Sequence, residues 1–443
     1  MEIDSEYAWL PPQYDVSQPP SFEASMQLAS NEDFAENFVR TAKWCPDGSA
    51  LLAQCENRTF QLFTRPASSS TSAKPSQAPD RVFAQPSPIL DFIWYPTASP
   101  IDPASFCFVA SVRECPVKLL DASDGRLRAS YRIVDHRERQ IAPHSLAFNI
   151  SAERLYCGFE DAVEVFDVNR PGEGTRLPTT PSKKSKDGLK GIISALAFVP
   201  SQGSDMYAAG SLSPTLSNIA MFSEAHGAEP VMFVSGGPPA GVTQINFNPA
   251  RPHMMYAAYR RHGAIYSWDI RSNVDAPVKV DVGSAPGIRW VLFMSKLTNG
   301  FGSPLYQNGK VSFFDLQGPD TPVEPSEEIS SSEAEESYAA LEFDAHGDAI
   351  GSVAFHPHRS LLLSASGSRH FHPTDASESS DSEESVDSEA DSHDAGTVPT
   401  CEMRGIRRRG RPHPVTLDAS IKTWAFDSQT ALPLQLPQVE IQT

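Results

Sequence analysis

The sequence has no run of about 18 apolar residues, the length that a membrane-spanning helix requires. Its N-terminal segment, residues 1–6, is acidic and lacks the basic start and apolar core of a secretory signal. The phosphate-binding motif GxxxxGK[ST], the nucleophile motif GxSxG and the zinc motif HExxH are also missing. These absences argue against a membrane partner, a secreted protein and the common classes of enzyme, and we expect no catalytic residue.

The cysteines and histidines show no metal-binding arrangement. The six cysteines, at positions 45, 55, 107, 115, 157 and 401, form no CxxC pair. Several fall in strand-like segments, where a thiol acts as a small apolar side chain, so we expect a reducing, intracellular compartment. Two alternating pairs, His356 with His358 and His370 with His372, have the ligand type for zinc but no carboxylate fixed beside them. We therefore predict no metal site and no other cofactor.

The net charge of −19 is unevenly distributed along the chain. Residues 320–337 contain seven acidic and no basic side chains, and residues 373–396 contain nine acidic and none basic, which leaves −3 for the rest. Both stretches are rich in serine and poor in apolar residues, so we expect disordered loop insertions at 320–337 and 373–416, with a shorter one at 66–80. The folded body is then nearly neutral and can carry basic patches.

A sevenfold repeat of short alternating segments is the strongest feature that is present. One segment of each repeat ends in an aromatic residue, at positions 44, 94, 148, 198, 247, 293 and 355. This spacing is slightly above the usual blade length of about 40–45 residues. Two further alternating segments follow each one, such as 106–110 and 117–121 in the second repeat. The sequence predicts an all-β fold, a seven-bladed WD-repeat β-propeller with acidic loop insertions.

The repeat makes the chain one folded unit with extensions. We expect an N-terminal extension at 1–30, a propeller over 31–435 with blades starting near 42, 91, 144, 193, 242, 288 and 351, and a tail at 436–443. An open edge strand promotes aggregation, so the ring has to close. Either 25–29 or 434–437 can supply the outer strand of the seventh blade, and we favour the N-terminal segment.

Several stretches outside the generic repeat resemble the telomerase Cajal body protein family of WD-repeat proteins. They are residues 36–48, 124–131, 144–148, 157–159, 191–198 and 365–371, and the acidic insertion after the last of them is also similar. The resemblance implies a propeller that binds small guide RNAs through a short loop sequence, the CAB box, and directs them to Cajal bodies. Telomerase RNA is one such cargo in animals, and a yeast relative is linked to pre-mRNA splicing instead.

Basic residues recur in the turns between second and third strands, which project from one face of a propeller together with the links into the first strands. Five of the seven turns carry them: Arg58, Arg113, Arg260 with Arg261, Lys310, and Arg369. The link into the first strand of blade four adds Lys183, Lys184, Lys186 and Lys190.

These cations suit RNA, because lysine and arginine neutralise phosphates and arginine also stacks on unpaired bases. Nearby rings, which are His144, Tyr259, His262 and His370, are expected to offer further stacking surfaces. We predict that this face binds RNA. The alternative is that turns are polar simply because they are exposed, which by chance accounts for basic residues in about two or three blades.

The acidic insertion in the seventh repeat has two interpretations. It contains candidate phosphorylation sites at Ser379, Ser380, Ser382 and Ser385, and the added charge would cover the basic face or the basic run 404–411. The simpler alternative is a tolerated surface insertion, because a longer loop costs little free energy.

These patterns together predict a monomeric, non-enzymatic protein of the nucleus and its Cajal bodies. We expect it to bind small guide RNAs, with telomerase RNA as a candidate, and to direct their localisation or assembly beside ribonucleoprotein proteins. The alternative is a protein–protein scaffold in pre-mRNA splicing that makes no direct contact with RNA. Basic runs at 183–190 and 404–411 are consistent with nuclear import.

Overall fold

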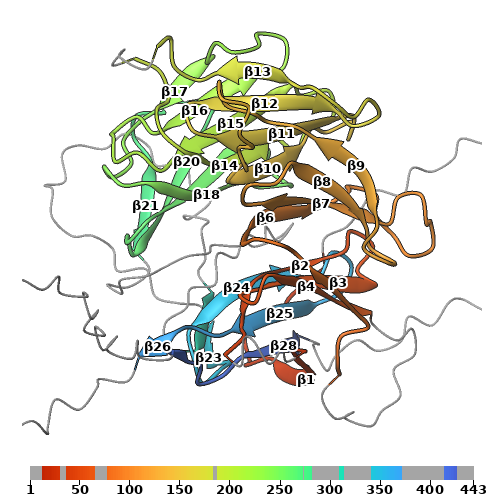
Figure 1. Ribbon diagram of the computed structural model, residues 1–443. Coiled ribbons are helices and arrows are strands. Elements are labelled where there is room, and N and C mark those ends of the chain that lie inside the picture. Colours follow the sequence, from red (N-terminus) through yellow and green to blue (C-terminus); the bar gives the residue numbers. More distant parts are fainter. Residues whose placement is uncertain are drawn as a thin grey trace, which may run out of the picture.

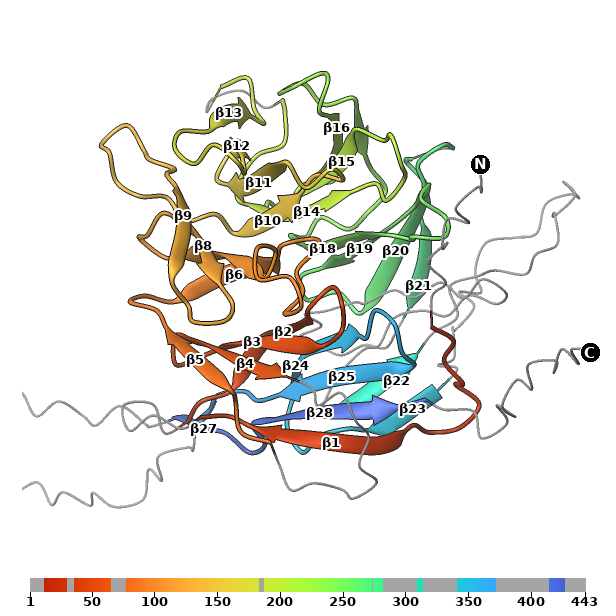
Figure 2. The same cartoon turned by 90° about the vertical axis from the view of Figure 1, so that its right-hand side faces the viewer.

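The computed structural model describes residues 12–29, 36–64, 77–182, 187–272, 274–281, 309–313, 341–371 and 414–426. All regular structure in these residues is β, and antiparallel sheets follow one another around the molecule (Figures 1 and 2). This part of the chain contains no helix that is long and apolar enough to cross a membrane. The prediction of an all-β propeller is confirmed.

Five sheets contain four consecutive strands each, with the first strand innermost. The first sheet has β2 (Val39–Trp44), β3 (Ala50–Cys55), β4 (Thr59–Thr64) and β5 (Arg81–Ala84). The second has β6 (Ile89–Trp94), β7 (Cys107–Val112), β8 (Val117–Asp121) and β9 (Leu127–Tyr131). The third has β10 (Ser145–Phe148), β11 (Arg154–Phe159), β12 (Ala162–Asp167) and β13 (Thr175–Pro178). The fourth has β14 (Ile193–Phe198), β15 (Met206–Ser211), β16 (Ile219–Ser223) and β17 (Met232–Val234). The fifth has β18 (Val242–Phe247), β19 (Met254–Tyr259), β20 (Ala264–Asp269) and β21 (Val278–Asp281).

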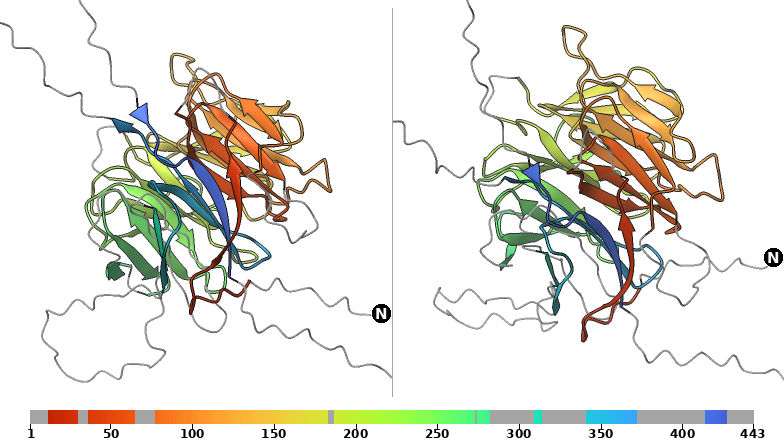
Figure 3. Two further views of the ribbon diagram at one scale, coloured as in Figure 1. Left: turned by 90° about the horizontal axis from the view of Figure 1, so that it is seen from below. Right: turned by 60° about the horizontal axis from the view of Figure 1, so that its bottom comes forward.

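A sixth four-stranded sheet joins segments from both ends of the chain. Its order from the inside is β24 (Ile350–Phe355), β25 (Leu361–Ser366), β28 (Ser420–Ala425) and β1 (Ser21–Gln27). Figure 3 shows β1, in red, lying along β28, in blue. The outer strand is therefore N-terminal, and it overlaps the segment 25–29 that the sequence favours for closure. The segment 434–437 lies outside the described residues.

The described residues do not fix the number of blades at seven. They form the six four-stranded sheets above, a two-stranded sheet of β22 (Lys310–Phe313) and β23 (Leu341–Asp344), and a short pair of β26 (His370–Phe371) and β27 (Pro414–Val415). β22 and β23 follow position 293 in the chain, where the sequence predicts the later strands of blade six. The predicted first strand of that blade, 288–293, lies outside the described residues, so the seven-blade count stays a prediction.

The sequence repeat is matched by a repeated irregularity of the backbone. In five sheets the register between the first and second strands shifts after the first residue of the first strand, at Ile89, Ile193, Val242, Ile350 and Val39. A bulge of this kind bends a strand and increases its local twist. The same bend in these five sheets keeps their inner strands in equivalent positions around the ring.

Hydrogen bonds and aromatic side chains join neighbouring blades. Ser352 Oγ lies 3.0 Å from Ala42 N, Lys43 Nζ lies 3.2 Å from Asp91 Oδ1, and Ser194 Oγ lies 2.6 Å from Val242 O. The indole nitrogens of Trp94 and Trp44 donate to carbonyls of the preceding blade. Most of the repeat's aromatic residues that the structure describes are buried, and truncating one such ring typically costs about 3–5 kcal/mol.

Candidate nucleic-acid interface

The turns between second and third strands lie beside the links into the first strands. In five blades the residue that follows the second strand donates its backbone N–H to the residue that precedes the first strand: Glu56 to Phe38, Arg113 to Pro88, Leu212 to Ile192, Arg260 to Gly241, and Gly367 to Ala349. The donor–acceptor distances are 2.7 to 2.9 Å. This repeated bond places turns and links on the same face, called the turn face below.

Four predicted arginines are exposed on the turn face: Arg58, Arg113, Arg260 and Arg261. Arg58 (φ 64°) and Arg261 (φ 61°) have left-handed backbone conformations, which favour glycine or asparagine and cost other residues roughly 1 kcal/mol. Arg113, Arg260 and Arg261 make no ion pair with any described residue. Their guanidinium groups therefore present unneutralised charge to solvent.

Two other predicted cations are already neutralised. Arg369 makes an ion pair with Glu56, which also binds Arg40 from the same sheet, and the Glu56 side chain is only 9% exposed. Lys310 Nζ lies 2.8 Å from Glu342 Oε1, and this contact raises the pKa of Lys310 and lowers the pKa of Glu342. A phosphate would have to compete with these carboxylates.

Of the remaining predicted cations, the structure describes only Lys190. Lys190 is half-buried, and its backbone oxygen accepts a hydrogen bond from Ser211 Oγ. Lys183, Lys184, Lys186 and the basic run 404–411 lie outside the described residues, as do Ser379, Ser380, Ser382 and Ser385. Their roles stay predictions.

The predicted stacking residues differ in accessibility. Tyr259 is 1% exposed and packs edge-on against Tyr266, with ring centroids 5.3 Å apart, so the prediction that it stacks on a base is wrong. Its position at the end of β19 turns its ring inward. His144 is exposed, and partial desolvation of its ring and then the nearby charge of Arg113 lower its pKa. His262 is partly exposed, whereas His370 is held by Asp348.

Asp348 joins the two chain segments that flank residues 372–413. Its carboxylate lies 2.9 Å from His370 Nε2 and 2.8 Å from Ser368 Oγ on the incoming side, and 3.1 Å from Leu417 N on the outgoing side. Burial raises the pKa of Asp348, but the hydrogen bonds from His370 and Ser368 outweigh it, so the net shift is downward. The base of the predicted insertion is therefore fixed to the turn face.

Asp418 has a structural role in the turn before β28. It accepts a hydrogen bond from Gly347 N at 2.9 Å and another from Ser420 Oγ at 2.6 Å, and it lies 3.5 Å from the buried His346. Ser364 Oγ continues the network, 2.7 Å from His346 Nε2 and 2.8 Å from Trp424 Nε1. The contact with His346 holds the pKa of Asp418 far below its usual range. These groups stabilise the sixth sheet and are not free for ligand binding.

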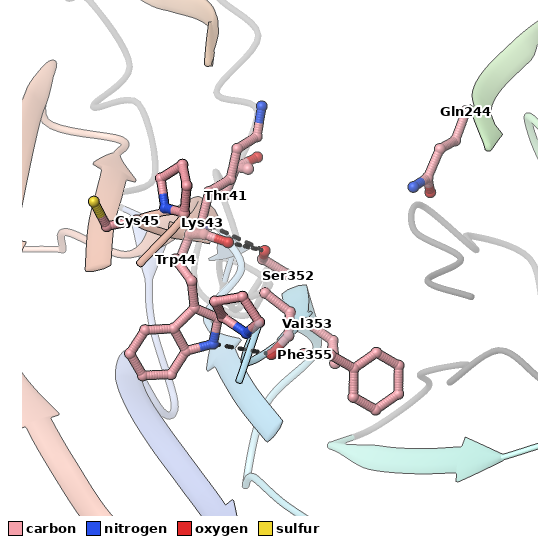
Figure 4. Close-up of a pocket in the computed structure, with 12 residues that line it drawn as sticks. Thr41, Lys43, Trp44, Cys45, Gln244, Ser352, Val353 and Phe355 are labelled. Carbon is pink, nitrogen blue, oxygen red and sulfur yellow. Dashed lines mark hydrogen bonds between the residues drawn. The ribbon is translucent and has the colours of Figure 1, made fainter. Parts of the chain in front are cut away.

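A cavity of about 310 Å³ opens between β2 and β24, with Gln244 of β18 facing it from the opposite side (Figure 4). Its wall includes Trp44, Val353 and Phe355, and the polar atoms of Ser352 are used by Ala42. Lys43 is directed to Asp91 and to the Phe92 carbonyl. The cavity thus belongs to the joint between blades and offers no uncommitted charge.

His356, Cys55 and Cys107 are committed to packing. His356 Nε2 lies 3.0 Å from Gly48 O, and its Nδ1 accepts from the backbone N–H groups of His358 and Arg359. Burial raises the pKa of Cys55 to about 12 and that of Cys107 to about 11, so neither thiol is a reactive thiolate. Among the described residues no group of three or more histidine, cysteine or acidic side chains is placed to hold a metal ion.

No protein-family model matches the chain. It is 29% identical to telomerase Cajal body protein 1 of Mesocricetus auratus over 387 residues, which cover 84% of this chain and 65% of that protein. The Homo sapiens protein of the same name is also 29% identical, over 85% of this chain and 64% of the human chain. Guanine nucleotide-binding protein negative regulator 1 of Schizosaccharomyces pombe is 29% identical over 37% of this chain and 43% of its own length.

None of these relatives is named as an enzyme, and the chain spans slightly less than two thirds of the length of the mammalian ones. The resemblance found in the sequence is confirmed: this chain is a homologue of proteins named telomerase Cajal body protein 1.

Proposed function

We propose that this chain is a non-enzymatic propeller that binds small Cajal body guide RNAs, with telomerase RNA as a candidate cargo. It acts as a monomer in the nucleus and its Cajal bodies, and it directs the localisation or assembly of these RNAs with ribonucleoprotein proteins. The names of the mammalian relatives support the cellular setting.

One structural observation supports the RNA-binding part above all. Arg113 of the second sheet and Arg260 and Arg261 of the fifth occupy equivalent turns, are exposed on the turn face and have no described acidic partner. Exposed guanidinium groups repeated around one face can follow a phosphodiester backbone, and each neutralised phosphate releases counterions. Arginine also stacks on unpaired bases, which suits the single-stranded loops of guide RNAs.

We propose seven blades for the ring that carries this face. The two-stranded sheet β22–β23 has the phase of third and fourth strands. The inner strands β18 and β24 border the cavity that contains Gln244 and Val353, and the predicted inner strand 288–293 falls between them in the chain. A seventh inner strand at that place would complete the circle.

We also propose that the acidic insertion regulates the turn face, because Asp348 and Thr416 fix its base there. Thr416 donates to Glu36 from both its N–H and its hydroxyl group. Deletion of 373–396 then strengthens RNA binding at low salt. An unchanged affinity would leave the insertion as a tolerated surface loop.

Ultraviolet crosslinking of the tagged protein in cells tests the proposed function. We expect recovery of small guide RNAs that share a loop sequence, and the purified full-length chain should bind one of these RNAs more tightly than the same RNA with that sequence changed. Recovery of splicing proteins without crosslinked RNA would overturn the proposal and support the protein-scaffold alternative.

A further inference from the structure

Three segments of blades four and five meet on the turn face. They are the turn 212–218, the link 237–241 and the turn 260–263. Asn218 Nδ2 donates to the backbone oxygens of Ser213 and Ala240, and Arg260 N donates to Gly241 O at 2.7 Å. A Cβ atom at Gly241 would lie 2.7 Å from the Leu212 oxygen, so the link passes close against the first turn. We call these three segments the blade four–five strip.

The strip differs from the rest of the turn face in its charge. It contains Arg260, Arg261 and His262 and no aspartate or glutamate. At its edge Lys190 lies next to Gly191, which packs against Ser213. The adjoining carboxylate of Asp161 is occupied, since its Oδ1 accepts from Gly191 N at 2.7 Å. The guanidinium groups of the strip have no ion-pair partner among the described residues.

The turn 212–218 adds small hydroxyl groups and an apolar side chain to this charge. Thr215 and Ser217 are exposed, and Leu216 is 66% exposed. Hydroxyl groups donate hydrogen bonds to phosphate oxygens, and an exposed leucine offers an apolar surface for a base or a ribose. The strip thus combines the three kinds of group that contact single-stranded nucleic acid.

The backbone conformation of Arg261 also supports a binding role for the strip. A left-handed conformation at this turn position would be more favourable for glycine or asparagine. Arg261 has this unfavourable conformation although its side chain makes no ion pair with a described residue. Strained positions of this kind are concentrated at functional sites.

We propose that single-stranded RNA crosses the propeller at the blade four–five strip, with Arg260 and Arg261 on phosphates and Leu216 against a base or ribose. The inference rests on the proposed RNA-binding function and assigns its main contact. It adds His262, Thr215, Leu216 and Ser217 to the predicted site, and it gives Arg369 and Lys310 a minor role because Glu56 and Glu342 already neutralise them.

Fluorescence anisotropy with the full-length chain and a labelled single-stranded RNA of about 16 nucleotides tests the inference. The double variant R260E/R261E should lose about tenfold or more in affinity, and the slope of log affinity against log salt should fall by about 1.4, which corresponds to two phosphate contacts. The matched control is R170E/R251E, which makes the same charge change at two exposed arginines in turns on the opposite face. It should change the affinity by less than about twofold.

A second variant separates apolar contact from charge. Leu216→Ser should weaken binding by about threefold to fivefold without a change in the salt slope. If R260E/R261E and R170E/R251E bind the RNA with equal affinity, the blade four–five strip is not the RNA contact. The proposed RNA-binding function would still stand. Failure of the unmodified chain to bind either this RNA or a guide RNA would instead overturn the proposed function.

Discussion

Two regions of the turn face carry similar numbers of cations but use them differently. Around the sixth and first sheets, Arg40 and Arg369 share the carboxylate of Glu56, and His370 binds Asp348. Around the fourth and fifth sheets, Arg260 and Arg261 face solvent and no acidic residue occurs in the strip. The first region uses charge to hold the chain together, whereas the second leaves charge available. Counting basic residues therefore overestimates a binding surface unless their partners are known.

The largest expected effect comes from reversing three exposed charges on the turn face. The triple variant R58E/R113E/R260E should lower RNA affinity by about 100-fold or more, because three phosphate contacts become repulsive. Melting temperature should stay within a few degrees of the parent, since these exposed turn residues contribute little to packing. Anisotropy titration and thermal melting measure the two effects.

The contrasting variant is R40Q/R369Q, which removes two cations from the paired region. RNA affinity should change by less than about threefold, because both charges are already neutralised by Glu56. A loss as large as that of the triple variant would erase the distinction between the two regions.

The paired region should show the stronger dependence of stability on pH. The contact with His346 depresses the pKa of Asp418 in the folded state. The contribution of Asp418 to the free energy of unfolding is therefore full above its unfolded pKa of about 4 and is lost as pH falls below it. Asn cannot titrate, so the variant D418N should be less stable at pH 7 by about 1–2 kcal/mol and should lose less stability on going to pH 3. Urea unfolding at several pH values checks this, and parallel curves would contradict it.

Removing the charge of Glu56 should turn the paired region of the turn face into one with available cations. In E56Q the carboxylate that neutralises Arg40 and Arg369 is gone, so both cations become available and RNA affinity should rise by about fivefold at low salt. The free energy of unfolding should fall by about 1–2 kcal/mol because the partly buried pairs are lost. E342Q is the control, since its pair with Lys310 is half-exposed on both sides and contributes little to stability. A fall in affinity with E56Q would show that the carboxylate positions these arginines for binding.

The smallest effect concerns one backbone conformation. R261N should keep or slightly raise the free energy of unfolding, by up to about 1 kcal/mol, because asparagine tolerates the left-handed conformation better than arginine. RNA affinity should fall by about threefold with the loss of one charge. A destabilised R261N would mean that the side chain has a packing role.

The first strands could be predicted from the sequence because their alternation and terminal aromatics repeat. The predicted starts near 42, 91, 193 and 242 fall within three residues of the observed strands. The outer strand β13 (Thr175–Pro178) was not predictable, because it is largely exposed and short, so no apolar pattern marks it. Outer strands contact a neighbouring strand on one edge only, so packing constrains their sequences less than those of inner strands.

The candidate site was predictable only in part. The phase of the repeat places Arg113 and Arg260 in exposed turns, and the structure agrees. The same phase cannot show that Arg369 meets Glu56, because the two residues belong to different sheets from opposite ends of the chain. Nor did it indicate the exposed Leu216, which lies in a turn that lacks any basic residue. Contacts between blades depend on tertiary geometry that a single repeat does not encode.

The pairing of β1 with β28 has a consequence during synthesis. The ribosome makes residues 21–27 long before residues 420–425, yet both belong to one sheet. A nascent chain therefore carries an unmatched strand throughout the synthesis of the residues between them. Premature termination before residue 420 would leave two bare edges, those of β1 and β25, and bare edges recruit other chains.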